Sequence, residues 1–295
     1  MTYFVNFGLT GFFGIFFAAL LFALVIHRTM MSPCSSLKEL LAPFPFSKVL
    51  LLITELFLLV LYSAMLSASS EVLLRIFNIN RFAGTLITAA AVTLIILKGY
   101  NSISDLSEVL FIPIVIIIFI ISLTSTEKSV TIPPPTVIDT KAFLSPVIYV
   151  SYNMLTTIPL LITIPDKYMY RNCGNQVGIV IFILSAMLIM PLYTHYSDIS
   201  SSTLPLMELL NGRIKYLYEV LLMLAIFSTA VSAGYALLHS SKNTGTVKSA
   251  LFINFTAVII SFLGFNTIVN KVYFIFGIPG ILSVAVLFLP SKIKQ

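Results

Sequence analysis

Residues 49–70 read VLLLITELFLLVLYSAMLSASS, a run of 22 residues in which Glu55 is the only charged side chain. A helix of about 20 apolar residues crosses the hydrocarbon core of a bilayer, which is ~30 Å thick. Lipid offers the backbone no hydrogen-bond partner, so a run of this kind inside a membrane must be helical. The run therefore predicts a transmembrane helix.

Eight further stretches have the same character, and Glu219 is the only charge inside them. The nine predicted spans are 4–26, 49–70, 82–97, 109–124, 143–164, 177–193, 216–238, 250–265 and 272–289. Charged residues make up 9% of the chain, and its mean hydropathy is +1.04. A soluble domain carries about a quarter charged residues. The sequence therefore predicts an all-α, polytopic membrane protein. Its nine transmembrane helices form a single transmembrane domain, residues 1–295, in the bilayer of the cell membrane.

Several function classes find no support in the sequence. The net charge is +6, but the basic residues are scattered one or two per connection and form no patch for nucleic acid. No nucleophile elbow, phosphate loop or HExxH motif occurs, and no span holds paired carboxylates or a cluster of metal ligands. We therefore expect no enzyme activity and no cofactor, apart from Na⁺ or H⁺ as a coupling ion.

The loop charges predict an orientation in the membrane. With nine spans, the connections on the side of the C-terminus carry more Lys and Arg than those on the other side. The positive-inside rule then places the N-terminus outside and the C-terminus in the cytoplasm. Cys34 and Cys173 face the reducing side in this arrangement, so we expect no disulfide.

The fifth span contains the most polar stretch, residues 145–159, which reads SPVIYVSYNMLTTIP. Pro146 and Pro159 bracket it, and proline frees backbone carbonyls by removing helical hydrogen bonds. An amide and hydroxyls at this depth, with freed carbonyls, suit a small zwitterion or ion. The alternative is that these groups form hydrogen bonds between helices. We favour a substrate site, with Tyr149, Ser151, Asn153 and Thr156 as its residues.

The seventh span reads AIFSTAVSAGY over residues 225–235. Ser228 and Ser232 lie one turn apart, with Thr229 beside them, and hydroxyl oxygens are ligands that hard cations such as Na⁺ prefer. The alternative is that the hydroxyls bond the carbonyls four residues earlier in a closely packed helix. Both interpretations stay open, and the first gives Ser228, Thr229 and Ser232 to ion coupling.

Glu55 is the charged residue deepest in a predicted span. A carboxylate at this depth is costly unless it is paired, protonated or hydrated. It either reaches the membrane surface and pairs with Lys48, or it forms a proton or cation site. The second interpretation adds Glu55 to the predicted ion-coupling residues.

Five short motifs together resemble a known family. They are Phe7-Gly8-x-x-Gly11-x-x-Gly14, YVSYN at 149–153, LPLME at 204–208, AIFSTAV at 225–231 and GIPG at 277–280. In order and spacing they resemble the bacterial YkvI-like membrane proteins. These are distant members of the amino acid–polyamine–organocation superfamily, which has the LeuT-type fold.

The resemblance implies two inverted repeats of five helices. The family's first, broken helix would precede Phe7, so we expect a LeuT-type fold that is missing its first helix. The nine spans then match the family's second to tenth helices. The fifth span then matches the other broken helix, and the seventh matches a helix that helps to bind sodium in some members. The implied function is a secondary transporter, or a transporter-like remnant, for a small organic solute such as an amino acid, coupled to Na⁺ or H⁺. The alternative is a ligand-sensing subunit, similar to spore germination receptors, that binds without transport.

Overall fold

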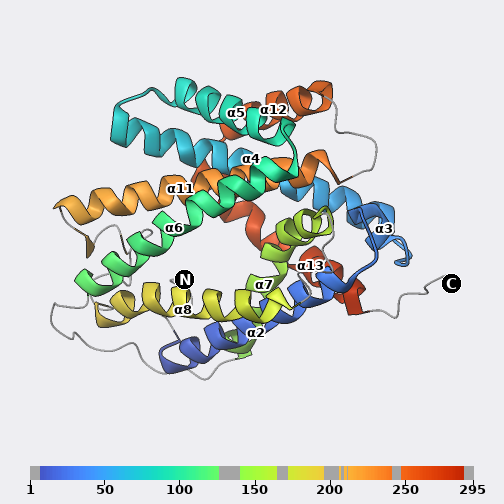
Figure 1. Cartoon of the computed structure of the whole chain (residues 1–295), viewed down its shortest axis with the longest axis horizontal. Coiled ribbons are helices and arrows are strands. Elements are labelled where there is room, and N and C mark those ends of the chain that lie inside the picture. Colours follow the sequence, from blue (N-terminus) through green and yellow to red (C-terminus); the bar gives the residue numbers. More distant parts are fainter. Residues whose placement is uncertain are drawn as a thin grey trace.

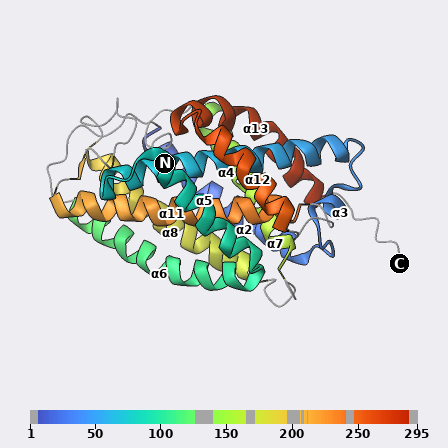
Figure 2. The same cartoon turned by 90° about the horizontal axis from the view of Figure 1, so that it is seen from above.

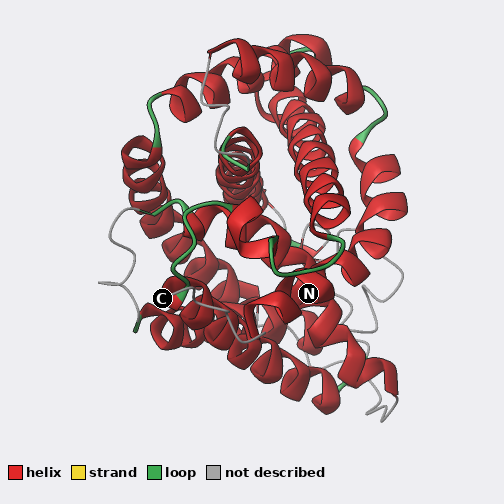
Figure 3. Ribbon diagram, turned by 90° about the vertical axis from the view of Figure 1, so that its right-hand side faces the viewer, coloured by secondary structure: helices red, strands yellow, loops and turns green. Residues whose placement is uncertain are grey.

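A computed structural model describes residues 7–125, 140–164, 172–195, 206, 209–210, 212–240 and 247–288. Figure 3 shows that these residues form helices joined by short loops, and the described chain contains no strand. Residues 4–6 and all of the 204–208 motif except Leu206 lie outside the described residues. The helices are α2 (Leu9–Met31), α3 (Leu37–Leu41), α4 (Ser47–Phe77), α5 (Arg81–Leu97), α6 (Tyr100–Ser125), α7 (Thr140–Ile162), α8 (Cys173–Thr194), α11 (Gly212–Leu238), α12 (Val247–Ser261) and α13 (Phe265–Phe288).

Each predicted span coincides with a helix, and six of these helices are long and apolar enough to cross a membrane. The six are α2, α4, α6, α7, α8 and α11. The other three contain shorter apolar segments, Arg81–Leu97, Val247–Ser261 and Ile278–Phe288. The prediction of a polytopic all-α membrane protein is confirmed. The number of nine spans and the orientation in the membrane stay predictions.

Several helices extend beyond the apolar stretches that predicted them. α4 has 31 residues and continues to Phe77, and α6 begins at Tyr100, well before residue 109. At 1.5 Å per residue, α4 is ~46 Å long, which exceeds the hydrocarbon thickness. A helix can continue into the polar interface of the membrane. Its residues there are no longer apolar, so hydropathy does not reveal where the helix ends.

Large apolar side chains cover the outside of the bundle. Phe13 in α2, Val109 in α6, and Phe252 and Phe255 in α12 are between 67% and 72% exposed. Exposed apolar area of this extent is rare on proteins surrounded by water. In a bilayer these side chains contact lipid, which agrees with the predicted location.

The helices form two groups. α4, α5, α11 and α12 pack on one another, and α2 packs on both α7 and α8. Figure 1 shows α5 and α12 at one side of the molecule and α2 and α8 at the other, and in Figure 2, seen from above, α5 and α12 lie nearer to the viewer. α6 contacts α11 and α8, and α13 contacts α4 and α7, so each of these helices joins the two groups.

The contact between α2 and α8 depends on small residues. A Cβ atom added at Gly174 would lie 2.5 Å from the Ala23 carbonyl oxygen. One added at Gly178 would lie 2.8 Å from the Ala23 Cβ and 3.0 Å from the Ala19 carbonyl oxygen. Small residues let helices approach closely in a membrane, where dispersion forces replace the hydrophobic effect.

We predict that Gly178→Ala destabilises the protein by about 1–3 kcal/mol, the usual cost of overpacking. The measurement is thermal unfolding in detergent. Gly234→Ala is the control, because a Cβ atom there would meet its nearest neighbour at an ordinary 3.5 Å. Equal stability of the two variants would contradict the proposed closeness of α2 and α8.

Candidate functional site: a polar cavity between the helix groups

A cavity of about 420 Å³ lies between α7 on one side and α4 and α11 on the other. α7 belongs to one helix group, whereas α4 and α11 belong to the other. The cavity is lined by Phe57, Leu61, Met65, Tyr149, Tyr152, Asn153, Thr156, Thr157, Leu160, Ser228, Thr229 and Ser232. Six of the eight predicted site residues therefore meet at one place.

The α7 wall carries the amide of Asn153. Its Nδ2 donates to the Tyr149 carbonyl oxygen at 2.6 Å, and the Thr157 hydroxyl donates to the Asn153 carbonyl oxygen at 3.0 Å. Both bonds stay within α7, so neither is the interhelical bond that was the alternative interpretation. Oδ1 of Asn153 and the hydroxyl of Thr156 have no hydrogen-bond partner among the described residues.

Two prolines shape the same helix. Pro146 and Pro159 lie inside α7. Pro159 has no N–H to donate to the carbonyl oxygen of Leu155, which directly precedes Thr156. The sequence thus places a carbonyl without its helical donor next to the polar face of α7.

The α11 wall carries hydroxyls. Thr229 donates to the Ala225 carbonyl oxygen at 2.8 Å, which is the bond within the helix that the alternative interpretation expected. Ser228 and Ser232 make no such bond, and their hydroxyls have no partner in the described part of the chain. Their hydroxyls therefore remain available to a solute, an ion or water.

The α4 wall is apolar, and the sequence reasoning did not identify it. Phe57, Leu61 and Met65 recur at every fourth residue and so share one face of the helix. Tyr152, Thr157 and Leu160 of α7 also line the cavity and were missed. The four-residue spacing of these apolar residues in α4 could have indicated a cavity wall. Residues of a buried core show the same spacing, so the sequence alone does not distinguish the two.

Ser151 lies away from the cavity. Its side chain is 3% exposed and donates to the Val147 carbonyl oxygen at 2.7 Å. The backbone at Ser151 instead faces α13, where a Cβ atom added at Gly280 would lie 2.5 Å from the Ser151 carbonyl oxygen. The structure thus places Ser151 in a close helix contact, apart from the other predicted substrate residues.

Glu55 also lies outside this cavity. It lines a second cavity, of about 430 Å³, together with Ser240 and Lys248. The Ser240 hydroxyl, 3% exposed, donates to Oε1 of Glu55 at 2.6 Å. The structure therefore separates Glu55 from Ser228, Thr229 and Ser232, with which the sequence grouped it.

The lining determines what the central cavity can hold. It offers the amide of Asn153, seven side chains with a hydroxyl and the ring of Phe57, and none of its lining residues carries a formal charge at neutral pH. The described residues contain no group of three or more His, Cys, Asp or Glu that could hold a metal ion. The chemistry favours reversible binding of a solute that is neutral overall.

Comparison with models of known protein families finds none that matches this sequence. Comparison with curated protein sequences also finds no match. The function must therefore be argued from the cavity and from the arrangement of the helices around it.

Cysteine accessibility tests which residues line the cavity. In a chain with Cys34 and Cys173 replaced by Ser, we predict that Ser228→Cys reacts with the small reagent aminoethyl methanethiosulfonate. Ser151→Cys should react far more slowly, because the side chain at this position is buried. The measurement is the mass increase with time in detergent. Equal rates at the two positions would contradict the assignment of the cavity wall.

Proposed function

We propose that the protein is a secondary transporter for a small organic solute without net charge, such as a zwitterionic amino acid. The observation that carries the proposal is the position of the cavity, which has one wall in each helix group. Transporters built from inverted repeats bind their solute between two helix groups near the middle of the membrane. They then move one group against the other.

The helix contacts support inverted repeats. If α2, α4, α5 and α6 are exchanged with α8, α11, α12 and α13, most of the contacts are preserved. The contact of α4 with α5 becomes that of α11 with α12, and that of α4 with α12 becomes that of α11 with α5. Likewise, α6 on α11 becomes α13 on α4, and α6 on α8 becomes α13 on α2. Two repeats related by a pseudo-two-fold axis would produce this pattern.

α7 and the short α3 have no counterpart among the described helices in this exchange. The resemblance to the YkvI-like proteins gives the family's first helix as the counterpart of α7. In that resemblance α7 is a broken helix, and the prolines inside α7 agree with such a role. These features favour the LeuT-type arrangement over an unrelated helical bundle.

The size and chemistry of the cavity support a small solute. Sites for small molecules usually have volumes of ~300–1,000 Å³ and a few polar groups on largely apolar walls. In our proposal Asn153 and Thr156 bind the polar groups of the solute, and the apolar α4 wall contacts its side chain. Tyr149 lines the cavity beside them.

The free hydroxyls of α11 support a coupling ion. Ser228 and Ser232 supply neutral oxygens, which suit Na⁺ better than a divalent ion that requires carboxylates. Glu55 offers a separate place for a proton, since it lies in the other cavity. We therefore propose Na⁺ as the coupling ion of the central cavity.

Binding and uptake by the full chain test the proposed function. Purified protein in proteoliposomes with an inward Na⁺ gradient is exposed to radiolabelled L-amino acids, one at a time. We predict uptake of at least one, and Asn153→Ala should weaken its binding about tenfold, as expected for the loss of one or two hydrogen bonds.

Ser151→Ala is the matched control, because it changes the same helix outside the cavity, and we predict near-normal binding. Binding without uptake would favour the sensor over the transporter. No binding of any amino acid, or equal binding by the Asn153 and Ser151 variants, would contradict the proposed site.

A further inference from the structure

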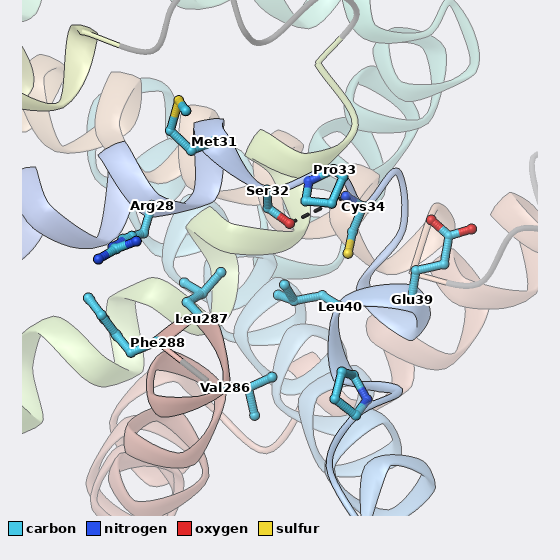
Figure 4. A pocket seen from close by; sticks show the side chains of 11 residues that line it. Arg28, Met31, Ser32, Pro33, Cys34, Glu39, Leu40, Val286, Leu287 and Phe288 are labelled. Carbon is cyan, nitrogen blue, oxygen red and sulfur yellow. Dashed lines mark hydrogen bonds between the residues drawn. The ribbon is translucent and has the colours of Figure 1, made fainter. Parts of the chain in front are cut away.

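A third pocket, of about 270 Å³, lies where the end of α2, the short helix α3 and the end of α13 meet (Figure 4). Its polar lining includes Arg28, Ser32, Cys34 and Glu39. Its apolar lining includes Val286, Leu287 and Phe288. Nothing in the proposed transport cycle uses this pocket.

Arg28 lines this pocket, and its guanidinium lies over an aromatic ring. Its guanidinium carbon lies 5.5 Å from the centroid of the Phe288 ring, within the range of a cation–π contact. Among the described residues, no acceptor takes a hydrogen bond from the guanidinium. Arginine has five N–H donors in a planar fork, a geometry that matches phosphate and carboxylate oxygens.

Glu39 also lines the pocket, but its carboxylate accepts hydrogen bonds from Ser35. Oε2 of Glu39 accepts from the backbone N–H and the hydroxyl of Ser35, both at 2.9 Å. The Glu39 backbone N–H in turn donates to the Ser36 hydroxyl, completing a cap at the start of α3. Figure 4 shows Glu39 and Arg28 on opposite sides of the pocket. The positive charge of Arg28 is therefore left for an external anion.

Arg28 also lies at the end of a stripe of exposed apolar side chains on α2. Phe13, Phe17, Leu20 and Leu24 follow one another along one side of α2 and are between 44% and 70% exposed. Arg28 comes one turn after Leu24, in the last turn of the helix. At 1.5 Å per residue the stripe and Arg28 together cover ~22 Å, close to the length of an extended acyl chain.

We propose that this pocket binds the phosphate of an anionic phospholipid, whose acyl chains lie along the stripe of α2. The Arg28 guanidinium donates to the phosphate oxygens, and the Phe288 ring holds it in place. Lipid is favoured over a soluble anion because the charge and the apolar stripe are continuous on one helix. The bound lipid joins the end of α2 to the end of α13. This proposal stands independently of the transported solute.

Native mass spectrometry of the full chain in detergent tests the proposal. Dioleoylphosphatidylglycerol and dioleoylphosphatidylcholine are added in separate titrations, and the affinity of the first bound lipid is compared. We expect wild type to bind phosphatidylglycerol about tenfold more tightly, as expected for a charge-assisted pair. Arg28→Gln should abolish this preference. Arg28→Lys keeps the positive charge and should reduce the preference without abolishing it, because lysine lacks the planar fork.

Arg81→Gln is the matched control, because Arg81 is an exposed arginine at a helix end that lines none of the pockets described above. It should keep the full preference for phosphatidylglycerol. Three results would overturn the proposal: no preference in wild type, an unchanged preference in both Arg28 variants, or an equal loss in the Arg81 variant. Displacement of the lipid by millimolar inorganic phosphate would also overturn it, because the ligand would then be a soluble anion.

Discussion

The hydrocarbon core of a bilayer offers no hydrogen-bond partner, and this constraint governs where every polar group of the protein can lie. Many hydroxyls in the helices meet it by donating to a carbonyl oxygen of their own helix. Thr29, Thr54 and Ser63 do so at 2.8, 2.9 and 2.7 Å. Ser283 in α13 is the one fully buried side-chain oxygen among the described residues that lacks a partner. Asn153, Thr156, Ser228 and Ser232 have side-chain atoms without a hydrogen-bond partner among the described residues, and all four line the central cavity. A solute or ion would satisfy them, and this is the physical basis of the proposed site.

The same constraint applies to polar groups at the contacts between helices. Between α4, α5 and α12, the Tyr62 hydroxyl donates to Oδ1 of Asn254, and Nδ2 of Asn254 donates to the Thr93 hydroxyl. Buried and mutually satisfied, these groups hold three helices of one group in a fixed arrangement. Where α4 and α11 meet α7, the hydrogen bonds of Asn153, Thr157 and Thr229 stay within their own helices. In our proposal, the remaining polar atoms of Asn153, Thr156, Ser228 and Ser232 bind a ligand at this contact, where the two groups separate.

The sequence predicted where the polar residues lie along the helices better than the direction in which each side chain points. Hydropathy located nine apolar segments, and the polar residues of two of them meet in one cavity as predicted. Ser151 and Glu55 lie outside the central cavity for a common reason. Successive helical residues are 100° apart, so Ser151 lies ~200° around α7 from Asn153, and Glu55 lies ~200° around α4 from Phe57. Hydropathy gives the position along a membrane helix, whereas its rotation depends on neighbours that only the folded structure reveals.

The central claim is that the two helix groups move relative to each other around the cavity. Double electron–electron resonance between spin labels at Gln176 in α8 and Val247 in α12 measures the distance between the groups, after Cys34 and Cys173 are replaced by Ser. A second pair, Lys98 at the end of α5 and Val247, lies within one group and is the control. The account predicts two distance populations for the first pair in proteoliposomes and a single population for the control. A single narrow distance for the first pair, unchanged between sodium and potassium buffers, would contradict it.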